Sequence, residues 1–465
     1  MRNKVPMITE IPYQADSARL FERIVDRPWS VFLDSGHPGS TQGRYDILSA
    51  EPMLTLTTRG SVTEIRSPGA CRRAFEDPFD VVRDCLQVER IPATGLPFVG
   101  GAIGYFAYDL ARRIERLPSV ADADNGLPEM AIGIYDWAVV VDHAAHRAWL
   151  VAYGRDPGTA GKWASLKALF EMPNVAVPRQ TFGVHGPVRA NLTWDQYRAG
   201  FARIKRYIHD GHCYQVNYAQ RFTASADGDP WTAYRTLRHL NPAPFSAYLH
   251  MPFGQVLSAS PERFLLVQDE HVETKPIKGT RPRGSDLASD KRLAEELRNS
   301  RKDQAENLMI VDLLRNDIGK SCRSGSVKVP ALFELQSFAN VHHLVSTVTG
   351  ILKPGLDALH VLRGCFPGGS ITGAPKVRAM EIIEELEPHR RSVYCGAIGY
   401  LGFDGRMDTN IAIRTMICTA GQVHFYAGGG IVADSEASAE YHECFDKAAP
   451  TLQLFNQLEL GRVGS

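Results

Sequence analysis

Residues 130–141, MAIGIYDWAVVV, give the first indication of the fold class of this 465-residue chain. The run is rich in β-branched and aromatic residues and is bounded by turn formers, which is typical of β-strand. Similar runs precede residue 172, where few helices are expected: Trp29–Leu33, Pro52–Thr58, Ala102–Tyr108 and Ala148–Tyr153. The first part of the chain is therefore predicted to be mainly β.

The second part of the chain mixes strands with helices. Strands are predicted at Tyr214–Thr223, Ala247–Met251, Arg263–Val267 and Val423–Ala427, and helices at Asp290–Leu314, Pro375–Glu387 and Ser435–Phe455. These strands and helices do not alternate strictly, as they do in a doubly wound parallel sheet. The pattern favours an α+β fold.

A break separates the two parts. Residues 172–191, MPNVAVPRQTFGVHGPVRAN, contain three prolines and two glycines and show no periodicity long enough to predict a helix or a strand. We interpret them as a linker. Thr193–Gln196 then fits a capping box, which begins a helix that Asp210–Gly211 ends. We predict an N-terminal region, 1–175, and a second domain, 192–455.

One short sequence occurs in both parts, because Gly101–Tyr105 and Gly396–Tyr400 are both GAIGY. Two glycine-bearing strands that other backbone approaches closely are a simpler explanation than a duplication.

The composition argues against several functional classes. Lys plus Arg and Asp plus Glu each total 52, so the chain lacks the excess positive charge of a nucleic-acid or anionic-membrane binder. The eight cysteines include no CxxC pair and no histidine at ligand spacing, which argues against a disulfide framework and a zinc site. The N-terminal residues contain no apolar signal segment. We expect a globular cytoplasmic protein with no nucleic-acid or membrane partner.

The segment Pro367–Lys376, PGGSITGAPK, is a candidate anion site because it precedes a predicted helix, whose free N–H groups attract negative charge. Ala374–Pro375 stands where a P-loop has Lys followed by Ser or Thr, so a carboxylate is a better candidate than a nucleoside triphosphate. Taken alone, the segment is equally compatible with a glycine turn before a helix.

Acidic residues on two predicted helices suggest a metal site. Glu436, Glu440 and Glu443 fall on one helical face, and the usual explanation of such a stripe is a solvated surface. Glu306, however, enters an apolar helix, where a carboxylate needs a partner. Two helices that offer carboxylates, without Cys or His, suit Mg²⁺ that holds an oxyanion substrate.

The basic segment Lys275–Arg283 contains two lysines of interest. Lys275 and Lys278 are an odd number of positions apart, so in an extended strand only one of them can face inward. A surface loop and a lysine whose pKa is lowered in a dry pocket are both compatible with this sequence.

Seven segments together resemble the chorismate-utilising enzymes across nearly the whole chain: Pro276–Thr280, Asp312–Asp317, His342–Ser346, Gly368–Lys376, Ile413–Thr415, Gly428–Ile431 and Glu440–Lys447. The resemblance is strongest to the aminodeoxychorismate synthase branch, which serves 4-aminobenzoate and folate synthesis, and it extends to anthranilate synthase component I. It implies two large, mainly antiparallel β-sheets packed as a sandwich, with helices on the outside.

The resemblance also implies how the substrate is held. It implies Mg²⁺ on Glu306, Glu440 and Glu443, where the metal holds the ring carboxylate of chorismate. Arg414 and Tyr394 match the residues that bind the enolpyruvyl carboxylate. The other implied substrate contacts are Thr372, Gly373, Ala374, Gly429 and Gln215.

The resemblance implies three catalytic residues, and the choice of reaction depends on one of them. Glu262 matches the general acid, which needs a raised pKa, and His343 lies near the C4 leaving group. Lys278 stands where anthranilate synthases have alanine. In the aminodeoxychorismate branch this lysine attacks C2 of chorismate as the C4 hydroxyl leaves, and ammonia then enters C4 and expels the lysine. Gln215 replaces the lysine base of isochorismate and salicylate synthases, which disfavours attack by water.

The implied reaction is thus amination of chorismate with ammonia to 4-amino-4-deoxychorismate, with anthranilate synthase component I as the alternative. No segment resembles a glutamine amidotransferase, so ammonia is expected from a separate glutamine amidotransferase subunit. Some relatives also hold tryptophan in the N-terminal region, where Ser35, Arg44 and Tyr45 match pocket contacts. Asp34 replaces the glutamate of feedback-regulated relatives, so inhibition is not expected.

Overall fold

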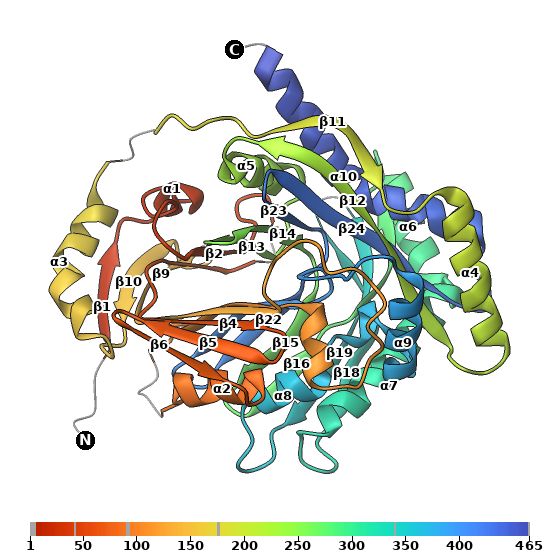
Figure 1. Cartoon of the computed structure of the whole chain (residues 1–465), viewed down its shortest axis with the longest axis horizontal. Coiled ribbons are helices and arrows are strands. Elements are labelled where there is room, and N and C mark those ends of the chain that lie inside the picture. Colours follow the sequence, from red (N-terminus) through yellow and green to blue (C-terminus); the bar gives the residue numbers. More distant parts are fainter. Residues whose placement is uncertain (1–5, 41–42, 90–93, 174–176, 339–340, 464–465) are drawn as a thin grey trace.

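The computed structural model describes residues 6–40, 43–89, 94–173, 177–338 and 341–463, and within these ranges the strands form two twelve-stranded sheets (Figure 1). Neighbouring strands pair antiparallel in both sheets.

The first sheet has the order β1 (Met7–Ile11), β10 (Arg147–Ala152), β9 (Trp137–Asp142), β3 (Tyr45–Ser49), β2 (Ser30–Asp34), β13 (Phe245–Met251), β14 (Gly254–Ser260), β23 (Thr415–Thr419), β24 (Gln422–Ile431), β12 (Gln215–Asp227) and β11 (Gly183–Ala190), with β20 (Gly373–Ala374) paired to β12. The second has the order β17 (Ile277–Pro282), β19 (Val341–Ile351), β16 (His271–Thr274), β15 (Arg263–Gln268), β22 (Met407–Ile411), β21 (Ala397–Gly402), β7 (Gly101–Phe106), β8 (Met130–Tyr135), β4 (Leu54–Arg59), β5 (Val62–Ser67) and β6 (Ala70–Ala74), with β18 (Lys328–Ser337) paired to β19.

The helices lie outside the two sheets (Figure 1). They are α1 (Ala18–Phe21), α2 (Pro78–Leu86), α3 (Pro157–Glu171), α4 (Trp194–His209), α5 (Pro230–Leu240), α6 (Leu287–Asn299), α7 (Arg301–Gly319), α8 (Ala358–Cys365), α9 (Lys376–Leu386) and α10 (Ala437–Val463), with short 3₁₀ turns η1 (Tyr108–Arg113) and η2 (Gly369–Ile371). α10 packs on β24, α9 on β12 and α7 on β19. The predicted α+β sandwich is confirmed. No helix in the described part of the chain is long and apolar enough to cross a membrane.

Inner strands of the first sheet, such as β2 and β9, are buried on both faces. Val31 of β2 and Val140 of β9 belong to the core between the sheets, whereas their neighbours Phe32 and Val139 belong to the core under the helices. Because successive side chains of a strand point to opposite faces, burial of both faces requires an unbroken apolar run.

The run 130–141 forms two strands rather than the single one predicted. β8 lies in the second sheet and β9 in the first, and Asp136 stands between them, where its carboxylate accepts a hydrogen bond from the Arg155 N–H at 2.7 Å. The apolar pattern does not reveal the crossing because both strands are buried.

Strands from the two sides of the predicted linker share both sheets, since β2 pairs with β13 and β7 pairs with β21. The prediction of a linker without strands is wrong for 183–190, which form β11 on β12. A register shift between His185 and Arg189 accommodates Pro187, which a regular ladder would exclude. Residues 174–176 of the predicted linker lie outside the described residues. The boundaries 1–175 and 192–455 stay a prediction.

Two local predictions have opposite outcomes. The single helix predicted at Asp290–Leu314 is wrong, because α6 and α7 meet at Ser300, whose hydroxyl accepts the Asp303 N–H. The capping box that begins α4 is confirmed by reciprocal hydrogen bonds between Thr193 and Gln196.

The two GAIGY segments lie side by side, with Gly104 of β7 opposite Gly399 of β21. A Cβ at Gly399 would stand 2.1 Å from the Asp408 carbonyl oxygen, and one at Gly104 would stand 2.0 Å from the Ala131 carbonyl oxygen. The interpretation that backbone approaches these glycines closely is confirmed.

We expect Gly399→Ala to destabilise the fold by about 1–3 kcal/mol, because the added methyl group overlaps backbone that cannot move freely. Gly161→Ala is the matched control: nothing lies within 4 Å of a Cβ there, in α3, and a stabilisation of about 0.5–1 kcal/mol is expected. Urea unfolding of both variants measures the difference. Equal stabilities would show that the contact at Gly399 relaxes at no cost.

Candidate active site

Of the two candidate lysines, Lys278 is the one that faces inward. Lys275 pairs with the Glu273 carboxylate at 3.2 Å, whereas the Lys278 Nζ donates to the Ser370 carbonyl oxygen at 3.0 Å. β17 carries a register shift directly after Lys278, where Gly279 adopts a φ of 77°. A bulge at this position changes the direction in which the Lys278 side chain points, relative to the other side chains of the strand.

Burial lowers the pKa of Lys278, and the charge of Lys447 lowers it further. The carboxylates of Glu306 and Glu262 act in the opposite direction, but burial is the larger effect. The result favours the neutral amine, which is the nucleophilic form of lysine.

Glu262 is buried in the turn between β14 and β15, where the Ile411 N–H donates to its carbonyl oxygen at 3.0 Å. Burial raises the pKa of its carboxyl group, against the lowering effects of a hydrogen bond from Ser370 and the charge of Lys278. A carboxyl group of raised pKa beside a lysine of lowered pKa is the pairing that a general acid and a nucleophile need.

His343 of β19 is buried and neutral, because burial lowers the pKa of its ring to about 4. Its Nδ1 lies 2.9 Å from the Thr280 hydroxyl, and its Nε2 has no hydrogen-bond partner among the residues that the structure describes. This nitrogen is therefore free to meet a polar group of a ligand.

Arg414 is the candidate anion-binding group. It has a φ of 50°, and no acidic side chain in the described ranges contributes to the pKa of its guanidinium. Burial alone shifts its pKa, downward, which agrees with a cation that has no acidic neighbour. Tyr394 is buried and stacks on Tyr426 at 5.1 Å between ring centroids. A partly buried cation without a counter-ion suits an anionic ligand.

The predicted substrate loop packs against the start of β12. Gly373 and Ala374 pair there with Val216 and Gln215, and a Cβ at Gly373 would stand 2.1 Å from the Gln215 carbonyl oxygen. The Thr372 hydroxyl donates to the Gly368 carbonyl oxygen at 2.9 Å. Both polar atoms of the Gln215 side chain are buried and have no partner within the described ranges.

The three predicted metal ligands lie on α7 and α10. The Lys302 Nζ lies 3.9 Å from Glu306 and 3.8 Å from Glu440, and burial raises the pKa of both carboxyl groups. Glu443 pairs with Lys447 at 2.7 Å. Gly429 lies against the acidic pair of α10, since a Cβ there would be 3.0 Å from Glu440 and 3.5 Å from Glu443.

These residues do not form a closed metal centre as they stand, because the described residues include no group of three acidic, His or Cys side chains close enough to hold an ion. Their chemistry nevertheless fits Mg²⁺. Carboxylate oxygens are hard donors, and the charge of Glu440 raises the pKa of Glu306, an effect that a cation between them would remove.

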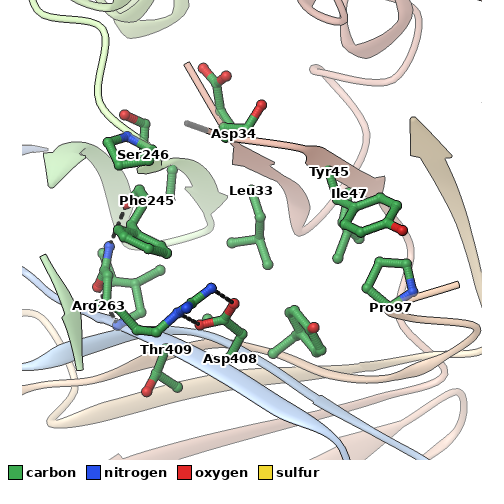
Figure 2. Close-up of a pocket in the computed structure, with 18 of the residues that line it drawn as sticks. Leu33, Asp34, Tyr45, Ile47, Pro97, Phe245, Ser246, Arg263, Asp408 and Thr409 are labelled. Atoms are coloured by element: carbon green, nitrogen blue, oxygen red, sulfur yellow. Dashed lines mark hydrogen bonds and ion pairs between the residues drawn. The ribbon is translucent and has the colours of Figure 1, made fainter. Parts of the chain in front are cut away.

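The predicted tryptophan contacts lie elsewhere, around a cavity of about 290 Å³ between the two sheets (Figure 2). Ser35, Arg44 and Tyr45 all line it, and the Ser35 hydroxyl has no partner in the described part of the chain. The Arg44 guanidinium, however, is engaged by Asp142 in two hydrogen bonds.

Asp34 lines the same cavity, but its carboxylate is used by the protein. It accepts from the Arg238 Nε at 2.8 Å and the Tyr234 hydroxyl at 2.9 Å, and Figure 2 shows it turned away from Leu33 and Asp408. A ligand in the cavity therefore meets few free acceptors on this side chain.

Sequence reasoning missed three residues that contact the predicted site. Ser370 contacts both Lys278 and Glu262, Thr280 contacts His343, and Lys447 contacts Glu443. Only Lys447 carried a signal, its i+4 spacing from Glu443 on a predicted helix.

The chain is similar to known proteins over almost its full length. The model of the chorismate binding enzyme family matches residues 35–453. Aminodeoxychorismate synthase component 1 of Klebsiella aerogenes is 48% identical, with 98% of this chain and 99% of that protein covered. Anthranilate synthase component 1 of Thermus thermophilus is 40% identical, with 93% and 94% covered. The crystal structure of anthranilate synthase component I from Streptococcus pneumoniae superposes with a TM-score of 0.79 at 32% identity, covering 88% of this chain and 92% of that one.

We expect Arg414→Met to raise the free energy of unfolding by about 1–3 kcal/mol, because it removes a partly buried charge that lacks a counter-ion. Arg263→Met is the matched control and is expected to lower stability, since it leaves Asp408 without its bidentate partner. Chemical unfolding of the ligand-free protein measures both. A loss of stability at Arg414 equal to that at Arg263 would contradict a free anion-binding cation.

Proposed function

The chain belongs to the chorismate binding enzyme family, as its sequence predicts, and we propose that it aminates chorismate at C4 to give 4-amino-4-deoxychorismate. The observation that carries the proposal is the position of Lys278, whose amine points inward to the Ser370 carbonyl oxygen near the carboxyl group of Glu262.

The first step uses these two residues as nucleophile and acid. The neutral Lys278 amine attacks C2 of chorismate, the ring double bonds shift, and the C4 hydroxyl leaves as water with a proton from Glu262. The neutral ring of His343, with its free Nε2, is suited to bind the departing hydroxyl. The product of this step is a covalent amine adduct at C2.

The second step reverses the shift of electrons. Ammonia attacks C4 of the adduct, the double bonds shift back, and the bond between C2 and Lys278 breaks, so that the lysine amine is regenerated. The enolpyruvyl group takes no part and is retained. No step of this sequence eliminates pyruvate.

The two carboxylates of chorismate are held by different chemistry. The unpaired Arg414 guanidinium, with Tyr394 and the backbone around Gly373, would receive the enolpyruvyl carboxylate. Mg²⁺ bound by Glu306, Glu440 and Glu443 would neutralise the ring carboxylate. Anchoring both ends fixes C2 and C4 relative to Lys278 and Glu262.

Ammonia would come from a partner. The relatives named component 1 imply a second component, and we assign that role to a glutamine amidotransferase subunit. Tryptophan is the ligand we propose for the cavity between the sheets, where Ser35 and Tyr45 offer polar contacts to an aromatic amino acid. It would act there as a structural ligand.

Anthranilate synthase component I is the alternative, and relatives of that name also match. Two observations favour C4 amination. The 48% identical relative is named aminodeoxychorismate synthase component 1, and the inward-facing side chain at position 278 is a lysine, whose amine can act as the nucleophile.

With chorismate, Mg²⁺ and ammonium at high pH, we expect the isolated chain to form a product in which an amine replaces the C4 hydroxyl. Glutamine alone should give no turnover. Lys278→Ala should lower the rate by roughly 100-fold or more, because the nucleophile is lost. Mass spectrometry of the products, and of Lys278 peptides from reactions without ammonia, detects the amine and the adduct.

Lys275→Ala is the control, since Lys275 pairs with Glu273 outside the site and its loss should leave the rate unchanged. Anthranilate and pyruvate as the main products would overturn the proposal in favour of the alternative.

The metal assignment predicts that Glu306→Gln and an excess of chelator each abolish turnover without unfolding the chain. Glu436→Gln, on an exposed residue just before α10, should keep full activity. Circular dichroism checks the fold and isothermal titration with Mg²⁺ checks binding. Full activity in excess chelator would refute the assignment.

A further inference from the structure

Ser370 of η2 contacts both proposed catalytic residues with different polar groups. Its carbonyl oxygen accepts the hydrogen bond from the Lys278 Nζ at 3.0 Å, and its hydroxyl bonds to the Glu262 carboxyl. Lys278 lies on β17 and Glu262 between β14 and β15, so Ser370 is the point at which three separate segments meet.

The backbone around Ser370 is closely packed against its neighbours. A Cβ at Gly368 would stand 2.5 Å from the Ile411 side chain of β22, and one at Gly369 would stand 2.7 Å from the Leu313 side chain of α7. On the C-terminal side of Ser370, the Thr372 hydroxyl donates a hydrogen bond to the Gly368 carbonyl oxygen. Ser370 is itself buried, so its two polar groups have fixed directions.

We propose that Ser370 is a positioning residue that sets the nucleophile and the general acid relative to each other. The inference rests on the proposed function, because it assigns Ser370 a part in the first step of that reaction. The serine forms no bond to the substrate and acts only through Lys278 and Glu262.

Each contact has a chemical consequence. The carbonyl oxygen of Ser370 fixes one N–H of the Lys278 amine, and this leaves the nitrogen lone pair pointing away from Ser370. The hydroxyl of Ser370 holds the carboxyl of Glu262, together with the Ile277 N–H, and stabilises the carboxylate that forms when the proton leaves. The acid can then give up its proton although burial makes this costly.

Ser370→Ala separates the two contacts, because it removes the hydroxyl and keeps the backbone carbonyl. We expect kcat to fall roughly 10- to 100-fold, as for loss of a hydrogen bond to a charged group, with KM changed less than about threefold. The loss of a donor to the carboxylate raises the pKa of Glu262, so the pH profile of kcat should move to higher pH. The other ionisable groups that influence Glu262 are Lys278, Lys447 and Cys395, and none of them changes in this variant.

Ser370→Thr keeps the hydroxyl and should restore the native position of the pH profile, even if the extra methyl group lowers kcat. Ser321→Ala removes another buried serine hydroxyl, one that bonds to the His360 carbonyl oxygen, and should leave both kcat and the pH profile unchanged.

The outcomes distinguish this inference from the proposed function. If the native chain makes no 4-amino-4-deoxychorismate, the proposed function fails first. If the native chain makes it and Ser370→Ala lowers kcat without moving the pH profile, or if KM rises in proportion, Ser370 has only a structural role and the inference is wrong.

Discussion

The inward position of the partly buried Lys278 amine is the constraint on which the site depends. A lysine on a surface strand would be a hydrated cation and could not act as a nucleophile. Burial favours the neutral amine, and the carboxyl groups of Glu262 and Glu306 limit how far the pKa falls. Burial and the nearby carboxyl groups therefore shift the pKa of Lys278 in opposite directions. These two effects come from different parts of the fold.

The sandwich supplies those parts. Lys278 comes from an end strand of the second sheet, Glu262 from the turn that joins a strand of the first sheet to one of the second, and Glu306 from a helix that packs on the second sheet. Glycines make this assembly possible wherever backbone passes close to backbone, as at Gly373 against β12. The structure explains why the two predicted parts of the chain cannot be understood separately: each sheet contains a block of strands from both parts, joined where β2 pairs with β13 and where β7 pairs with β21.

The sequence predicted the α+β class and ten of the 24 strands in the described residues, because long apolar runs are local signals, and the family resemblance implied Lys278 as the inward-facing lysine. It could not predict that residues 130–141 cross between sheets at Asp136, since a strand buried on both faces looks the same in either sheet. Nor could it predict β11, whose pairing with β12 overrides the effect of Pro187 at a bulge. Ser370 was hidden for a related reason: within a glycine loop, a serine that caps a turn and one that holds two distant side chains have the same local sequence.

The charged groups of the site lower the stability of the protein. The pH range in which each group lowers it differs, because their pKa values are shifted in opposite directions. Burial raises the pKa of Glu262 above 4.5, so the folded state binds more protons than the unfolded one, and stability falls as pH rises from 4.5 through the folded pKa. Burial lowers the pKa of Lys278 below 10.5, so its cost is present at low pH and is relieved as pH rises from the folded pKa toward 10.5. Arg414 adds a cation whose pKa is also lowered by burial. The two large apolar cores on either side of the first sheet offset these costs, which fall on the groups that the proposed reaction uses.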